Sequence, residues 1–125
     1  MRVVVITLLA GVLLAGCQGD EPSFVAGDYR PGDCRTVMPA AYAADRAVDE
    51  ADDDGAAAAS TLKSEQDTLR AALPSVTEMP VREAAQELVN AIGFYRIGVD
   101  AKNYTPKLGS AVRSAYDELA RVCQK

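Results

Sequence analysis

Apolar residues recur at alternating intervals of three and four along most of the chain. This spacing places them on one side of an α-helix. Four such stripes predict helices over 37–53, 56–73, 80–102 and 105–123. No segment alternates between apolar and polar residues for long, so strands are not expected. Because the connections between the predicted helices are short, neighbouring helices run antiparallel. We therefore predict an all-α, antiparallel, up-down four-helix bundle.

Residues with strong capping or turn preferences mark the ends of these helices. Thr36 and Thr105 are suited to cap the first and last helices, and Pro106 suits a first helical position. The acidic turn 52–55 is expected to end the first helix, because carboxylates are unfavourable at a helix C-terminus. A single helix over 37–73, kinked at this turn, is the alternative.

The chain begins with an apolar segment over residues 3–14. As a helix it would be about 18 Å long, whereas the core of a bilayer is about 30 Å thick. The segment is therefore too short for a permanent transmembrane helix and has the length of a signal-peptide apolar region. An ordinary secretory signal is one interpretation of it.

The apolar segment ends in Leu14-Ala15-Gly16-Cys17. This motif resembles the lipobox of bacterial lipoproteins, which reads Leu, two small residues and Cys. The resemblance implies that the Cys17 thiol carries a diacylglyceryl group and that cleavage occurs just before it. Two acyl chains give stable membrane attachment, so Cys17 is the expected anchor. The protein is then expected on the extracytoplasmic face of the bacterial cell membrane.

The lipobox divides the chain into three parts. Residues 1–16 form the signal peptide, 17–33 comprise the lipidated Cys17 and a flexible tether, and 34–125 form the helical bundle domain. The tether is assigned because it is rich in Gly, Pro and acidic residues and has no apolar period. Phe24 and Tyr29 are interpreted as isolated aromatics within it, although they are alternatively able to dock on the bundle.

Two cysteines remain after Cys17 is used for lipid. Cys34 precedes the first predicted helix and Cys123 ends the last one. An oxidising compartment favours their pairing, and a disulfide requires Cα atoms within about 7 Å. An even number of antiparallel helices brings the first and last ends together, whereas an odd number separates them by a helix length. The pair Cys34–Cys123 therefore favours four helices over three.

Composition excludes several classes of function. The 125 residues include 18 acidic and 13 basic residues, giving a net charge of −5, and no His. The acidic balance argues against nucleic-acid binding, and the absence of His excludes His-dependent catalytic and zinc sites. Residues 50–55 match the start of an EF-hand calcium loop, but Thr61 stands where that loop needs a bidentate Glu. We expect no enzyme activity, no metal site and no cofactor.

The most distinctive segment lies in the third predicted helix. Gly93 and Gly98 give room for a neighbouring backbone, and Phe94 lies off the apolar stripe. One interpretation is that this helix is central and buried on two sides. The other is a partner-binding surface, for which the candidate residues are Phe94, Arg96 and Tyr104, because aromatic anchors dominate interfaces.

The composition of the bundle domain, which is rich in Ala, acidic and free of His, resembles that of small lipoproteins of GC-rich bacteria, particularly actinobacteria. We expect a non-enzymatic interaction or structural module with a cell-envelope protein as partner. The alternative is a helical bundle that binds a small ligand or ion. A pocket with converging polar groups would favour the ligand, and an exposed apolar patch would favour the protein partner.

Overall fold

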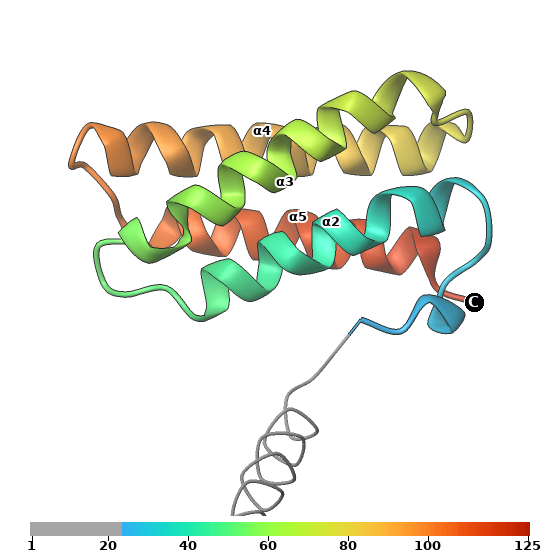
Figure 1. Ribbon diagram of the computed structural model, residues 1–125, viewed down its shortest axis with the longest axis horizontal. Coiled ribbons are helices and arrows are strands. Elements are labelled where there is room, and N and C mark those ends of the chain that lie inside the picture. Colours follow the sequence, from blue (N-terminus) through green and yellow to red (C-terminus); the bar gives the residue numbers. More distant parts are fainter. Residues whose placement is uncertain (1–23) are drawn as a thin grey trace, which may run out of the picture.

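Four α-helices make up most of residues 24–125, the part of the chain that the computed structural model describes (Figure 1). Short 3-10 turns connect or precede them. Each helix packs mainly against two neighbours: α2 and α4 both contact α3 and α5, and α2 makes a smaller contact with α4. The elements are η1 (Ala26–Asp28), α2 (Asp33–Asp49), η2 (Ala56–Ala58), α3 (Ala59–Ala72), η3 (Leu73–Ser75), α4 (Met79–Asp100) and α5 (Pro106–Cys123). The predicted all-α four-helix bundle is confirmed.

The bundle core comes from the four predicted apolar stripes. In each helix the residues spaced by three and four point inward, as helical geometry requires. The one buried polar side chain among the described residues is Gln66, which interrupts the α3 stripe. The fully buried members of the four stripes are Val37, Ala41 and Ala44 in α2, Leu62 and Leu69 in α3, Val81, Ala85, Leu88, Ile92 and Tyr95 in α4, and Val112 and Leu119 in α5.

The predicted disulfide joins the two ends of the bundle domain. Cys34 and Cys123 are bonded, their Cα atoms are 5.4 Å apart, and both side chains are completely buried. The first and last helices therefore meet at one end of the molecule, as an even number of antiparallel helices requires. The prediction of this pairing is confirmed.

The first helix is displaced toward the N-terminus relative to its prediction. It begins at Asp33 rather than at 37, so Cys34 lies inside its first turn and Thr36 is not its cap. It also ends at Asp49 instead of 53, and the segment 50–55 leaves the helix before Gly55 adopts a left-handed φ of 72°. Carboxylates crowded near a helix C-terminus oppose its dipole, which accounts for the early end. The alternative of one kinked helix is wrong.

The interpretation of Phe24 and Tyr29 as isolated aromatics in a tether is wrong. Their rings stack with centroids 5.7 Å apart, and Phe24 also packs against Tyr42 of α2 at 5.9 Å. Tyr29 pairs with Gln124 in a single antiparallel bridge. The packed part of the chain therefore includes residues 24–33, which the sequence analysis assigned to the tether. The signal peptide 1–16 and Cys17 lie outside the described residues.

Polar contacts fasten the same segment to the start of α4. The Arg30 guanidinium forms an ion pair with Glu78 at 2.9 Å and donates to the Val122 carbonyl. The Asp33 carboxylate accepts hydrogen bonds from the backbone N–H groups of Thr77 and Glu78, both at 2.9 Å. These N–H groups lie at the α4 N-terminus, where donors lack helical partners. Residues 24–33 are thus built into the bundle.

Candidate functional site

The three residues predicted to bind a partner do not share one surface. Phe94 lies on the outer side of α4 and is 64 % exposed. Arg96 lies on the side of α4 that faces α3, where it donates a hydrogen bond to the Gln66 side chain. Tyr104 follows α4 in the connection to α5 and is half-buried. Phe94 is the one of the three whose side chain presents a large apolar surface outward.

Tyr104 belongs to a packed corner of the bundle. Its ring meets the buried Tyr95 ring edge-on, with centroids 5.0 Å apart. The Tyr95 hydroxyl donates to the Gly55 carbonyl at 2.9 Å, which ties α4 to the turn before α3. Burial raises the pKa of Tyr95, and the neighbouring Tyr104 raises it further. The two tyrosines therefore hold the α2–α3 turn in place.

Arg96 likewise completes an internal contact. The buried Gln66 amide donates to the Val89 carbonyl at 3.0 Å and accepts from the Arg96 guanidinium. A Cβ on Gly93 would lie 3.2 Å from the Gln66 Nε2 atom, so the glycine leaves room for the amide. A buried amide needs such partners, because an unsatisfied polar group costs about 1–3 kcal/mol. We assign Arg96 to the α3–α4 contact.

The outer side of α4 carries an exposed apolar surface that the sequence analysis described only in part. Ile97 is 65 % exposed and lies three residues after Phe94, so the two side chains are neighbours on the helix. Its three-residue spacing from Phe94 could have identified Ile97 as part of the same surface. The sequence did not single it out, because Ile97 belongs to none of the four core stripes. We call this pair, Phe94 and Ile97, the α4 patch.

A groove runs beside the α4 patch, between α4 and α5. Its hollow of about 500 Å³ has a floor of small residues and includes Phe94 as one wall. Toward the N-terminus of α4 it continues into a second hollow of about 330 Å³. We call the two together the α4/α5 groove. The lining of the first part is Glu87, Asn90, Ala91, Phe94, Ala111, Ser114 and Ala115.

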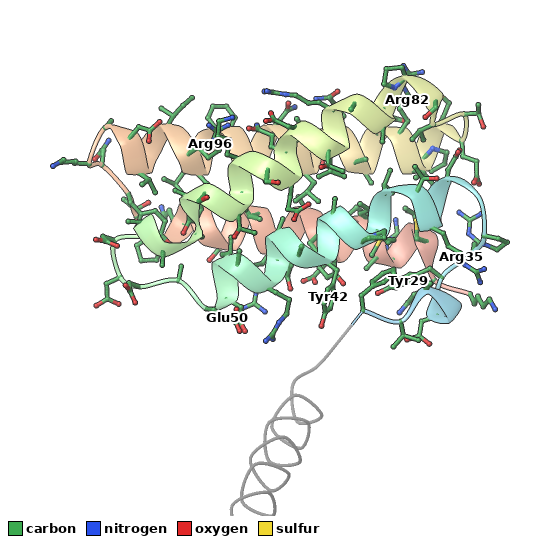
Figure 2. All side chains as sticks on the ribbon, in the orientation of Figure 1. Tyr29, Arg35, Tyr42, Glu50, Arg82 and Arg96 are labelled. Carbon is green, nitrogen blue, oxygen red and sulfur yellow. A yellow bond between two sulfur atoms is a disulfide. The ribbon has the colours of Figure 1, made fainter. Side chains whose placement is uncertain are left out.

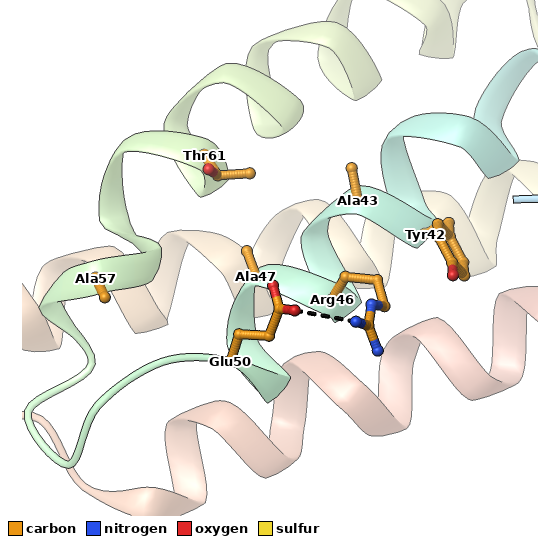
Figure 3. A pocket seen from close by; sticks show the side chains of 7 residues that line it. All are labelled: Tyr42, Ala43, Arg46, Ala47, Glu50, Ala57 and Thr61. Carbon is orange, nitrogen blue, oxygen red and sulfur yellow. Dashed lines mark hydrogen bonds and ion pairs between the residues drawn. The ribbon is translucent and has the colours of Figure 1, made fainter. Parts of the chain in front are cut away.

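A second groove lies on the opposite layer, between α2 and α3 (Figure 3). It measures about 540 Å³, and its lining includes three alanines and Thr61, with Tyr42 at one end. Its charged groups, Arg46 and Glu50, form an ion pair with each other at 3.0 Å on the rim. They neutralise one another instead of converging on the hollow. This geometry does not favour the small-ligand alternative.

A further set of ion pairs fastens α5 to α2. The Asp45 carboxylate is largely buried, and desolvation raises its pKa despite the nearby Arg113 guanidinium, whose Nε lies 3.4 Å away. Arg113 also binds Asp49 at 2.6 Å. Because the Arg113 guanidinium pairs with carboxylates of two α2 residues, we assign these charges to the α2–α5 contact.

The acidic turn was the one segment with a partial metal motif. Asp54 uses its carboxylate to accept a hydrogen bond from the Ala56 N–H at 3.0 Å, as a helix cap does. Among residues 24–125, no group of three or more acidic, His or Cys side chains is arranged to hold a metal ion. The turn therefore serves the start of η2 and α3.

Comparison with known proteins adds no family. No protein-family model, curated protein or solved structure matches this chain. Within residues 24–125, each helix is too short or too polar to cross a bilayer.

Proposed function

We propose that this protein is a lipid-anchored, extracytoplasmic lipoprotein whose helical bundle is a non-enzymatic interaction module. The lipobox Leu14-Ala15-Gly16-Cys17 supports the anchor. The α4 patch beside an alanine-lined groove supports the interaction. A single exposed apolar residue is ordinary, but an exposed Phe and Ile three residues apart on one helix, flanked by a groove, are typical of a protein-binding surface.

The exposure of Phe94 and Ile97 carries this proposal. Full burial of a Phe or Ile side chain contributes about 1.5–3 kcal/mol, so covering both is a substantial source of binding energy. Both side chains are about two-thirds exposed while Ile92 and Tyr95 on the same helix are fully buried. The bundle therefore folds without them, and they are free to contribute to a partner.

The position of the anchor suits this arrangement. Only six residues separate Cys17 from Phe24, so the fully extended connection spans at most about 25 Å. Phe24 packs against Tyr29 and Tyr42, which lie at the lower edge of the molecule in Figure 2. α4 lies at the upper edge in Figure 1. An anchored molecule then holds its α2 edge near the membrane and presents α4 away from it.

Replacing Cys17 tests the anchor. Cys17→Ala removes the only thiol that the lipobox places at the cleavage site, so incorporation of radiolabelled palmitate and recovery in the membrane fraction are both expected to be lost. The control is the double variant Cys34→Ala, Cys123→Ala, which keeps Cys17 and is expected to keep the label. Continued labelling of Cys17→Ala would show that the anchor assignment is wrong.

Truncating Phe94 tests the interaction module. With a photo-crosslinking residue at Ala101, next to the α4 patch, we expect adducts with another polypeptide in membranes. Phe94→Ala should reduce their yield about tenfold, the effect of 1–2 kcal/mol at an aromatic anchor. It should change the free energy of unfolding by less than about 0.5 kcal/mol, because the side chain is exposed.

A matched control lies at the other end of α4. Met79 is also exposed, at 58 %, but it is distant from Phe94 along the helix. Met79→Ala should leave the adduct yield unchanged. If Phe94→Ala and Met79→Ala behave alike, or if Phe94→Ala unfolds the protein, the α4 patch is not the interaction surface.

A further inference from the structure

One stripe of α5 has opposite charges at its two ends. Lys107, Ala111, Ser114 and Glu118 are spaced by four, three and four residues, so they lie along one side of the helix. Ala111 and Ser114 line the α4/α5 groove, and Glu118 lines its continuation. The stripe therefore runs along the groove from a basic end to an acidic end.

This stripe is complementary to itself when two copies run antiparallel. Its midpoint lies between Val112 and Arg113. A two-fold rotation about that point places Lys107 of one copy opposite Glu118 of the other. It also places Ala111 opposite Ser114, both small enough for close helix contact. Opposite charges in facing positions of an isologous interface are paired twice, once on each side of the axis.

Along the helix axes, Phe94 of the α4 patch lies level with the midpoint of the α5 stripe. Gly98 faces Leu108, since a Cβ on the glycine would lie 2.4 Å from the leucine Cδ1 atom. Ala91 lines the groove together with Ala115. Antiparallel helices in this register bring Phe94 level with Val112. Each copy therefore offers Phe94, one of its two most exposed large apolar side chains, level with the two-fold axis and beside the alanines of the groove.

We propose that the partner of the α4/α5 groove is a second copy of this chain, related by a two-fold axis perpendicular to the helices. In this dimer Phe94 of each copy packs into the alanine-lined groove of the other, and two Lys107–Glu118 ion pairs fix the antiparallel register. The inference rests on the proposed function, because it identifies the partner of the surface assigned there.

The charges along the groove favour this register. The end near the α4 N-terminus holds Glu83, Glu87 and Glu118, with Arg121 as the neighbouring cation. Arg121 binds Glu118 within the helix and lowers the pKa of that carboxyl. This end therefore carries a net negative charge. In the antiparallel register it attracts Lys107 of the second copy, which is exposed at the opposite end of the stripe. A parallel arrangement would instead place the acidic ends against each other.

The membrane anchor is compatible with this symmetry. In Figure 1, α4 and α5 lie behind α3 and α2, so these two helices form the rear layer of the bundle, whereas the lower edge is formed by α2. A two-fold axis that runs from the lower edge to the upper edge brings the rear layers of two copies together and keeps both lower edges on the same side of the dimer. Both Cys17 anchors then reach the same membrane.

Cross-linking of a single introduced thiol tests the dimer. In the full-length lipidated protein, Cys34 and Cys123 are bonded and Cys17 carries lipid, so Ala111→Cys supplies the one reactive thiol. Because Ala111 lies near the proposed axis, a short bis-maleimide should give a product of twice the monomer mass. The control is Ser64→Cys, which is exposed on α3 and should stay monomeric.

A charge exchange tests the register. In the Ala111→Cys background, Lys107→Glu and Glu118→Lys should each lower the yield of cross-linked dimer about tenfold, because each variant faces two like charges across the axis. The double variant Lys107→Glu, Glu118→Lys should restore it. Failure of the double variant to restore the dimer would overturn the proposed register.

The outcomes also separate this inference from the proposed function. An Ala111→Cys adduct with a polypeptide of a different mass overturns the second copy as partner but leaves the interaction module standing. The absence of any adduct, both from Ala111→Cys and from the photo-crosslinker at Ala101, overturns both.

Discussion

Two glycines of α4 are each required by a neighbouring group that occupies the space beside them. The sequence suggested that Gly93 and Gly98 make room for another backbone. In the structure Gly93 makes room for the Gln66 side chain. Gly98 makes room for the Leu108 side chain and also for the backbone of Asn103 and Tyr104, which lies 3.7 Å from its Cβ position. The pattern showed where small residues are needed but not which groups lie beside them, because those groups belong to other elements of the fold.

Gly55 is constrained both by its backbone and by its surroundings. Its φ is 72°, and a Cβ would lie 2.8 Å from the Tyr95 hydroxyl and from the Tyr104 ring. Gly55→Ala is therefore expected to lower the free energy of unfolding by about 1–3 kcal/mol, measured by urea denaturation. Gly27→Ala is the control, since nothing lies within 4 Å of that Cβ. Equal effects of the two substitutions would contradict this account.

At the scale of elements, the sequence predicted helix identity better than helix ends. The predicted and observed starts of the last two helices differ by one residue, because Pro80 and Pro106 restrict where a helix begins. The first helix starts four residues earlier than predicted. Its start depends on Gly32, whose φ of 87° turns the chain into the helix, and on contacts of Asp33 with residues far along the chain. The spacing of apolar residues indicates neither the turn at Gly32 nor the long-range contacts of Asp33.

Because the Asp33 carboxylate caps the N-terminus of α4, we expect the free energy of unfolding to depend on pH. The hydrogen bonds from the Glu78 and Thr77 N–H groups lower the pKa of the Asp33 carboxyl in the folded protein. Its stabilising contribution is therefore complete above the ordinary carboxyl pKa near 4, and is lost as the pH falls from there through the lowered folded-state value. Asp33→Asn should be less stable than the wild type at pH 7.

The test is the difference in free energy of unfolding between the wild type and Asp33→Asn, measured from pH 7 down to pH 3. We expect this difference to shrink in the acidic range as the wild-type carboxyl becomes protonated. Asp53→Asn, in the exposed α2–α3 turn, serves as the control. A difference that is independent of pH would show that the charge of Asp33 does not stabilise the α4 N-terminus.

At the scale of the whole molecule, the positions of Cys34 and Cys123 at the two ends of the domain predicted the arrangement of helices, whereas the aromatic residues before α2 gave no such signal. Phe24 and Tyr29 share no period with the bundle, so their packing was not recognisable. They contact Tyr42 of α2 and Tyr116 of α5, the two helices that the disulfide joins. The sequence likewise contained Phe94 as a candidate, but only the arrangement in space shows that Arg96 and Tyr104 serve the fold.

The disulfide is expected to supply much of the stability of this bundle, because several core positions are occupied by alanine and bury little area. Cys34 and Cys123 are separated by 89 residues, and the chain-entropy model gives about 4–5 kcal/mol for closing such a loop. The double variant Cys34→Ala, Cys123→Ala should therefore melt about 20 °C or more below the wild type, followed by circular dichroism. Reduction of the wild type should have a similar effect. A shift of only a few degrees would mean that helix packing alone holds the first and last helices together.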